Sequence, residues 1–579
     1  MKKIFKSTLF CGLMGLTCLS LGSCGDAFDY PDWQIIDDSQ DTGSSEGGVD
    51  RGDVADDILE GELKVALGLA IDFDTHKYQY SRTQSIDVFA GYTTVAKSKF
   101  DYGQPLYHTY DFPNGYYTGS IGESLKLYPQ LYHAYFFGEA HGKPEWKALA
   151  QIIYAYNMHE LVDFFGTIPY DDYRNLKATN PLTYLSCEET YNRIFEDLDE
   201  AIATLKERKP AKDALLRIEG EQGGYSNGNW ENWVRFANSI RLRMAMNMVR
   251  VDPGRAQQIA EAAVNDELGV ITENFGLPVG NGQQFEHPLY GISNIWGDSR
   301  LGASLENIMK RLHNPMLEIW FTKSGDINSS INGKKVLGAG KQCVGMRQGC
   351  SVDPSPAVNG YGAYSRFNVK YMPRNYFKMV EIYFLKAEGA LRGWNMGGGS
   401  AKDFYEQGIK KSFEENGATG VEKYLAQTEA DTKITYKDYY KSEFSELDNT
   451  RGVQIGVKWN ENDTDEVKLE KIITQKYIGN FPQSAEAWTN FRRTGYPRLF
   501  PVVAEVGGVE RCWPDKSFDN ETQLRRIPFD AVTANDLANI PGIETALGGK
   551  NQGGTCIWWD TMDYATQRDE NNRIVPKNF

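Results

Sequence analysis

The chain has 579 residues, of which 41% are hydrophobic and 24% charged. This ordinary balance excludes a chain that is disordered throughout and one built mainly of membrane-spanning helices. The formal net charge of −16 argues against nucleic acid as the main partner, because phosphate binding needs clustered Lys and Arg.

The N-terminus has the pattern of a secretory signal. Lys2, Lys3 and Lys6 precede an uncharged stretch over residues 9–21, which is shorter than the ~20 residues that a spanning helix needs. The junction Leu21-Gly22-Ser23-Cys24 resembles a bacterial lipobox, in which cleavage precedes a lipidated cysteine. We therefore predict a signal peptide over residues 1–23 and lipidation of Cys24. The alternative is ordinary cleavage beside an incidental cysteine.

Residues 24–57 are rich in Asp, Ser and Gly without a core-forming pattern, which predicts a flexible tether. We predict a single folded domain over residues 58–579. Five cysteines lie in this domain, an odd number, so at least one thiol stays free unless it pairs between chains. Cys343 and Cys350 are near enough in sequence to close a small disulfide loop, or to remain two thiols.

Helical periodicity dominates the domain. Apolar residues three and four apart predict three pairs of antiparallel helices. The pairs are 125–138 with 146–165, 188–206 with 230–249, and 376–394 with 401–414. Between them lie Gly-, Pro- and Tyr-rich stretches over 74–117, 275–300, 324–371 and 501–529. The predicted fold class is mostly α, a tetratricopeptide-like helix-pair scaffold with large irregular loop insertions.

Catalytic and metal motifs are missing from the sequence. There is no HExxH and no P-loop, and His133 and His141 supply too few ligands for zinc. The string Gly224–Gly228 matches G-x-S-x-G, but a polar loop precedes it where a nucleophile elbow needs a buried strand. The oxygen-rich run from Asn460 to Glu466 lacks the glycine of an EF-hand. We predict no catalytic residue, no metal site and no cofactor.

Sugar binding needs flat rings beside polar side chains, and three stretches supply both. Tyr78, Tyr80 and Arg82 alternate, and Trp296, Asp298 and Arg300 share the same two-residue spacing. An extended backbone would point each set to one side. The third stretch is the loop 351–364, with Tyr361 and Tyr364. These eight residues are the predicted ligand-binding set, although a lone aromatic such as Trp296 more often fills a core.

Six sequence blocks, in order, resemble the SusD/RagB-type lipoproteins. The second of them, Asn229–Arg243, resembles the W-x-K-F-A-N-S-L-x-L-R helix of these proteins, with Arg235 where that pattern has Lys. The six blocks are Phe165–Tyr170 (FGTIPY), Asn229–Arg243 (NWENWVRFANSIRLR), Glu381–Glu388 (EIYFLKAE), Ala485–Pro497 (AEAWTNFRRTGYP), Arg526–Phe529 (RIPF) and Trp558–Asp560 (WWD).

The resemblance implies an outer-membrane, lipid-anchored, surface-exposed protein that is not an enzyme. Such proteins bind nutrients, most often glycans, and pass them to a SusC-like TonB-dependent transporter. We favour a glycan as the ligand and keep an oligopeptide as the alternative. Two alternative functions from other classes are a surface glycoside hydrolase and a purely structural or adhesive protein. Within the blocks we expect Arg492, Arg493 and Glu381 to form buried ion pairs or helix caps rather than to bind ligand.

Overall fold

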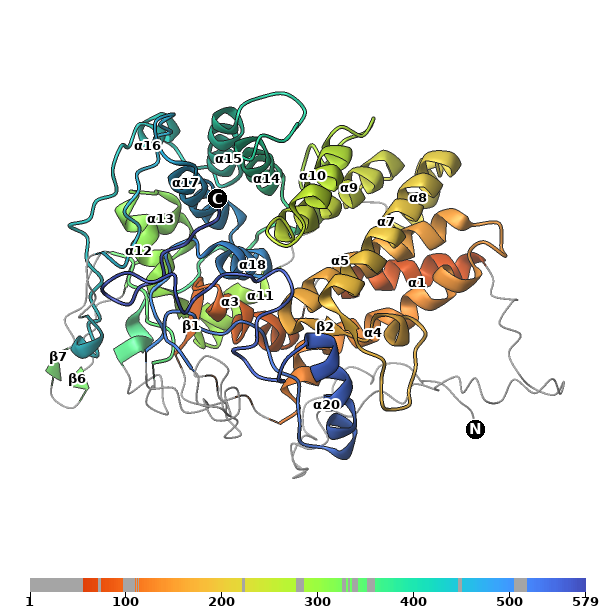
Figure 1. Ribbon diagram of the computed structural model, residues 1–579, viewed down its shortest axis with the longest axis horizontal. Coiled ribbons are helices and arrows are strands. Elements are labelled where there is room, and N and C mark those ends of the chain that lie inside the picture. The colour runs from red at the N-terminus through yellow and green to blue at the C-terminus, as the bar shows by residue number, and fades with distance from the viewer. Residues whose placement is uncertain are drawn as a thin grey trace, which may run out of the picture.

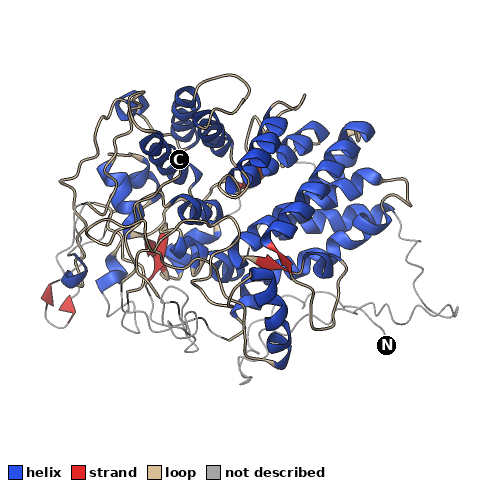
Figure 2. Ribbon diagram, in the orientation of Figure 1, coloured by secondary structure: helices blue, strands red, loops and turns tan. Residues whose placement is uncertain are grey.

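Helices make up most of the described part of the protein, and its strands are short (Figure 2). The structure is a computed structural model. It describes residues 56–579 except 71–73, 97–109, 111, 113, 221–223, 278–285, 325–329, 332–333, 336–341, 351–359, 446–449 and 504–517. The predicted signal peptide, Cys24, nearly all of the predicted tether and Cys512 lie outside the described residues.

One half of the molecule is a row of helices that pack against their neighbours, visible in orange to yellow-green in Figure 1. Contacts run from α1 to α4, α5, α7, α9 and α10 in turn, and α8 packs on α1. The predicted pairs in this half are confirmed, and α7 contacts both α5 and α9. The bounds are α1 Asp56–Leu69, α4 Tyr116–Phe137, α5 Pro144–Phe165, α7 Cys187–Arg208, α8 Lys212–Glu219, α9 Trp230–Asn247 and α10 Pro253–Val264.

Local sequence signals set the ends of these helices. Ser186 caps α7 in a reciprocal capping box with Glu189, and Pro144 occupies the first turn of α5. Gly166 ends α5 at φ +79°, where a Cβ atom would lie 2.5 Å from Cγ2 of Ile557. Only glycine allows both this left-handed turn and this close approach. Because α5 is buried on nearly every side, it forms the centre of the row.

The second half holds shorter helices around the pair α14 and α15, which α17 covers. The third predicted pair is confirmed, although α14 begins three residues later than expected because the strand β8 precedes it. The bounds are α12 Ala303–Arg311, α13 Met316–Trp320, α14 Met379–Leu391, α15 Ala401–Glu415, α16 Val421–Leu425, α17 Asp465–Asn480, α18 Ser484–Thr494 and α20 Ala534–Leu547.

Buried ion pairs and a helix cap hold the helices together, as the sequence analysis expected for Arg492, Arg493 and Glu381. Glu381 of α14 accepts two hydrogen bonds of 2.8 Å from Arg243 of α9. Arg493 of α18 donates to Glu388 at 2.6 and 2.9 Å. Arg492 instead donates to the carbonyl oxygen of Asp163 at 2.6 Å, which caps the end of α5. The recognised blocks therefore hold the scaffold together.

The strands form two-stranded antiparallel pairs. In this order they are β1 Thr93–Val95 with β5 Ser299–Leu301, β2 Thr167–Ile168 with β3 Leu185–Ser186, β4 Phe275–Leu277 with β8 Arg374–Phe377, and β6 Ser330–Ile331 with β7 Lys334–Lys335. Short helical turns complete the described structure: α2 Thr75–Tyr78, η3 Gln79–Thr83, α3 Ile86–Phe89, α6 Tyr170–Arg174, α11 Pro288–Tyr290, η5 Gly291–Ile295, η6 Gly360–Ala363 and η7 Ser442–Ser445.

Two local predictions are wrong. Residues 75–89 are mostly helical, with a π-helix at η3, so Tyr78, Tyr80 and Arg82 do not alternate along an extended strand. Trp296 follows a second π-helix, and only Arg300 of its set lies in a strand. Both runs were too short for a helical period to show in the sequence. The start of α1 at Asp56 also places helix two residues before the predicted domain start.

Cys343 and Cys350 are both buried free thiols. None of the helices in the described ranges combines the length and the apolar character needed to cross a bilayer.

Candidate functional site

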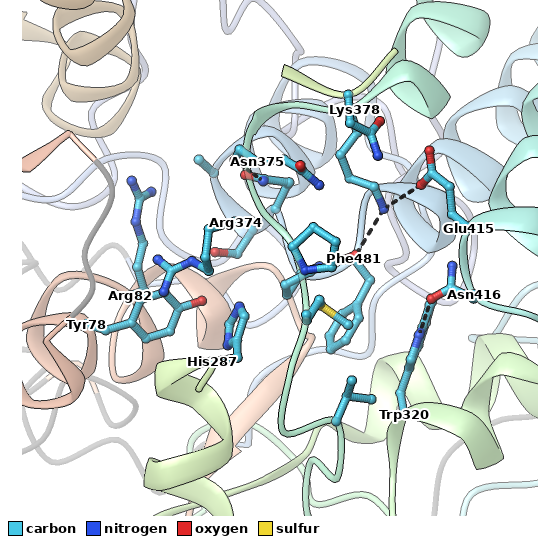
Figure 3. A pocket seen from close by; sticks show the side chains of 18 of the residues that line it. Tyr78, Arg82, His287, Trp320, Arg374, Asn375, Lys378, Glu415, Asn416 and Phe481 are labelled. Atoms are coloured by element: carbon cyan, nitrogen blue, oxygen red, sulfur yellow. Dashed lines mark hydrogen bonds and ion pairs between the residues drawn. The ribbon is translucent and has the colours of Figure 1, made fainter. Parts of the chain in front are cut away.

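A cavity of about 310 Å³ opens where the two halves of the molecule meet. Its volume lies at the lower end of the range for small-molecule sites, roughly 300–1,000 Å³. The lining comes from α2, η3, α5, α13, α15, the segment before α14, and the turn between α17 and α18. Figure 3 shows Tyr78, Arg82, His287 and Arg374 on one side and Trp320, Lys378, Glu415 and Asn416 on the other.

The first side combines guanidinium groups with an aromatic ring. Arg82 donates to Glu160 at 2.6 Å, and the guanidinium of Arg374 lies 5.4 Å from the ring centre of Tyr78. Burial alone would raise the pKa of Glu160, but attraction to Arg82 prevails and lowers it. Glu160 therefore stays ionised and keeps Arg82 in place at the cavity wall.

His287 is a neutral donor on the same side. Its Nδ1 accepts the backbone N–H of Leu289 at 3.2 Å, so the ring proton resides on Nε2. Burial, reinforced by the charge of Arg374, lowers the pKa of His287 well below 6.5. The ring therefore stays neutral over the physiological pH range.

The opposite side is built on a buried lysine. Nζ of Lys378 donates to the carbonyl oxygens of Gly479 at 2.6 Å and Phe481 at 3.3 Å, and it lies 3.5 Å from Oε2 of Glu415. Oε1 of Glu415 is a buried acceptor that receives no hydrogen bond from the described part of the protein.

Ring faces line the cavity between its polar groups. Trp320 stacks on Phe481 with ring centres 4.5 Å apart, and its N–H donates to Asn416 at 2.7 Å. Both rings are buried, whereas Tyr371 is 39% exposed. Tyr371 is thus the lining aromatic most accessible to an incoming ring. The cavity can therefore hold a small polar ligand by hydrogen bonds at both ends and ring contact at Tyr371.

A second feature, the Trp296 corner (residues 295–300), presents an exposed indole. Trp296 is 41% exposed and the neighbouring Ile295 is 67% exposed. Behind them the buried Arg300 donates to the carbonyl oxygens of Gly297 at 2.8 Å, Tyr361 at 2.9 Å and Gly362 at 3.1 Å. Burial and repulsion from Arg366 lower the pKa of Arg300 to about 9. These bonds fix the corner and leave the indole facing solvent.

Asp298, Tyr361 and Tyr364 of the predicted set are buried and do not face solvent. Asp298 is buried and accepts a 2.8 Å hydrogen bond from Gln79 of η3, which ties the corner to the helical turns beside the cavity. Tyr361 and Tyr364 are buried, and their hydroxyls donate to Asp438 at 3.0 and 2.8 Å. Burial raises the pKa of both tyrosines.

The eight predicted ligand residues thus divide into four groups. Tyr78 and Arg82 line the cavity, and Trp296 is exposed at the corner. Asp298, Arg300, Tyr361 and Tyr364 are buried in internal contacts. The half-buried Tyr80 packs on His76 with ring centres 4.9 Å apart and does not line the cavity.

Sequence reasoning missed most of the cavity lining, including Tyr371, Lys378 and Glu415. Lys378 and Glu415 flank the recognised α14–α15 pair but belong to no motif. Tyr371 was noted only as the end of a loop. The one signal available was its position, since it closes a Gly- and Tyr-rich insertion just before a buried helix.

The residues that sequence motifs raised for other chemistries have structural partners. His133 contacts Glu62 at 2.9 Å, and Asp463 of the oxygen-rich run binds Lys471 at 2.5 Å. Ser226 of the G-x-S-x-G string donates to Glu219 at 2.5 Å.

Comparison with known proteins gives the family. The model of the SusD-like family, described as Susd and RagB outer membrane lipoprotein, matches residues 62–560, and the chain belongs to this family. No curated protein is significantly similar to the chain.

Solved structures of relatives have the same fold. A chitin-binding SusD homolog from Flavobacterium johnsoniae is 31% identical with a TM-score of 0.72, covering 87% of this chain and 98% of the homolog. A SusD homolog from Bacteroides uniformis is 29% identical with a TM-score of 0.71, covering 88% and 100%. A SusD-like protein from Bacteroides thetaiotaomicron is 28% identical with a TM-score of 0.71, covering 89% and 100%.

Proposed function

We propose that this protein is a non-catalytic, cell-surface receptor that captures an oligosaccharide and delivers it to a SusC-like TonB-dependent transporter. The observation that carries the proposal is a cavity lined by polar groups and rings, on a protein that also presents the exposed indole of Trp296. Pyranose rings rest their C–H faces on such an indole, while their hydroxyls need donors and acceptors.

The chemistry of the cavity suits a polyhydroxylated ligand. The N–H-bearing side chains of His287 and Arg374 line one side, and the oxygen-bearing side chains of Glu415 and Asn416 line the other. Tyr371 adds a partly exposed ring. A relative 31% identical to this chain is described as chitin-binding, which favours a saccharide over a peptide as the ligand class.

The acids of the cavity support a non-catalytic role. Among its described lining residues Glu415 is the one carboxylate. Glycoside hydrolysis in its common form uses two carboxyl groups about 5–9.5 Å apart across the sugar. One acid paired to a buried lysine can bind a hydroxyl but does not provide that pair.

Attachment to the outer membrane completes the proposal. We propose that Cys24 is the lipidated first residue of the mature protein and that residues 25–55 act as a tether to the folded body. Two or three acyl chains bury enough methylene groups, at about 0.8 kcal/mol each, to hold a protein on a bilayer. Labelling with radioactive palmitate should mark the wild type, and Cys24→Ala should abolish the label.

Titration calorimetry tests the ligand class. Purified protein lacking residues 1–24 is titrated with neutral and acidic oligosaccharides and, in parallel, with a peptide library. Saturable binding of a saccharide, without release of reducing ends over a day, is expected. Binding of peptides alone would replace the proposal by oligopeptide capture. Steady release of reducing ends, lost on substitution of a single acid, would replace it by a surface hydrolase.

Recovery of the partner tests delivery. The tagged protein, isolated from mildly solubilised outer membranes, is expected to bring down one β-barrel transporter in comparable amount. Repeated isolation without any such barrel would contradict the delivery step and leave the ligand result unaffected.

A further inference from the structure

We propose that the protein carries a second saccharide-binding site, the Trp230 groove, which takes a neutral sugar unit. The groove is an open hollow of about 540 Å³ at the start of α9. Its lining residues are Pro210, Lys212, Ser226 to Trp230, Asn232 and Glu273. None of them lines the cavity described above, so the groove is a separate place on the molecule.

Trp230 supplies the flat face. It is the first residue of α9 and only partly buried, with one part of its ring packed on the core. The side chain of Asn229 caps the helix by accepting the backbone N–H of Glu231 at 2.9 Å. Because the helix start is fixed, the backbone that carries Trp230 is fixed as well. It lies at the start of the Asn229–Arg243 block, whose pattern tryptophan is the fully buried Trp233.

The turn before α9 supplies amide groups on a rigid backbone. Asn227 and Gly228 adopt left-handed conformations with φ of 56° and 72°. Buried Glu219 holds the turn by accepting hydrogen bonds from Ser226 at 2.5 Å and from the backbone of Gly228 at 3.1 Å. A Cβ atom on Gly228 would lie 2.8 Å from Cγ of Lys212, so the turn sits directly against α8.

Polar groups of the groove are available to a ligand. Asn227, Lys212 and Glu273 are exposed, and in the described residues none of their side chains takes part in a hydrogen bond or ion pair with the protein. Amide groups both donate and accept, which matches sugar hydroxyls. The two charges have opposite sign and cancel, so the groove favours a neutral sugar over a uronate or an amine.

The groove and the cavity are connected through one segment. Glu273 lines the groove and the next residue, Asn274, lines the cavity. A long glycan held at the cavity would then have a second point of attachment on the same molecule. Two weak sites on one chain raise the overall affinity for long polymers more than for short fragments.

Titration of variants tests the groove, with chitohexaose, maltohexaose and xylohexaose as probes. Wild type is expected to bind one of these at two sites. Trp230→Ala should weaken binding at the groove site at least about tenfold. The affinity of the other site should change less than about twofold. Trp230→Phe keeps a ring and should retain part of the binding. Phe136→Ala, which removes a 40% exposed ring on α4 outside both hollows, is the matched control.

A second variant guards against misfolding of Trp230→Ala. Asn227→Gly removes the amide but keeps the left-handed backbone, and it should also weaken the groove site. The contrary result is a wild type that binds at one site only, which Trp296→Ala abolishes and neither groove variant alters. That result would overturn the groove and leave the proposed saccharide capture intact. A wild type that binds none of the three probes would contradict the groove, whereas the wider panel of neutral and acidic oligosaccharides decides the proposed saccharide capture.

Discussion

Two regions of this protein use buried arginine in opposite ways. One is the ion-pair layer, made of Arg243, Glu381, Glu388 and Arg493, and the other is the ligand-facing surface at the Trp296 corner and Tyr371. In the layer, Arg243 and Glu381 are almost completely buried and satisfy each other. At the Trp296 corner, the buried Arg300 instead donates to backbone carbonyls and leaves the tryptophan exposed. The first arrangement fixes how helices pack. The second fixes where one side chain faces solvent.

The difference shows why family motifs did not reveal the site. The motif residues Glu381, Glu388 and Arg493 are buried, so a ligand cannot reach them. The groups that a ligand can reach, such as Trp296 and Tyr371, lie in insertions outside every block. Substitutions in the layer should therefore change stability, and substitutions at the surface should change binding.

The largest expected effect is on Glu381. Glu381→Ala leaves Arg243 buried without its carboxylate and also removes the acceptor of Asn480. Breaking a buried pair in this way costs about 3–5 kcal/mol of unfolding free energy. Urea denaturation followed by circular dichroism measures it. Glu414→Ala, which removes an exposed partner of Lys411, is the control and should change stability by less than about 0.5 kcal/mol.

Acid should weaken the layer through Glu388. Burial opposes ionisation of this carboxyl, but Arg493 and Arg392 prevail and lower its pKa from 4.5 to about 2. A lowered folded-state pKa stabilises the fold above pH 4.5, and that contribution is lost as pH falls from 4.5 towards 2. It amounts to about 3 kcal/mol.

Unfolding free energies of wild type and Glu388→Gln, measured from pH 6 down to pH 3, check this prediction. The gap between the two proteins should narrow as the pH falls. A gap that stays constant over this range would mean that Glu388 titrates normally in the folded protein.

On the ligand-facing surface, Trp296→Ala should weaken saccharide binding about tenfold, since a stacking contact of about 1.4 kcal/mol is lost. Stability should hardly change, because the indole is 41% exposed. Calorimetric titration and a denaturation curve on the same sample give both values. A large loss of stability with unaltered affinity would place Trp296 in the scaffold.

The smallest effect is expected at the cavity. Tyr371→Ala removes a ring that is 39% exposed and should weaken binding about threefold. Tyr371→Phe retains the ring and should restore most of the affinity. Equal losses in both variants would show that the hydroxyl, not the ring face, contacts the ligand.

Sequence reasoning predicted the helix pairs because their apolar period extends over several turns, as in α7 with Tyr191, Ile194 and Leu198. It failed over residues 75–89 and 291–295, where elements of four or five residues give no readable period. It selected both Trp296 and Tyr361 because they are aromatic. In the structure Trp296 is exposed and Tyr361 is buried, a difference that residue type does not predict. Exposure depends on Arg300 and its carbonyl partners, of which Tyr361 and Gly362 come from a distant segment and leave no local pattern.

Fluorine NMR of protein labelled with 5-fluorotryptophan tests the central claim most directly. The Trp296 resonance is assigned with Trp296→Phe and followed while a binding oligosaccharide is added. A saturable shift of that resonance, with the same dissociation constant that calorimetry gives, is the predicted result. An oligosaccharide that binds by calorimetry while the Trp296 resonance stays unshifted would contradict the account.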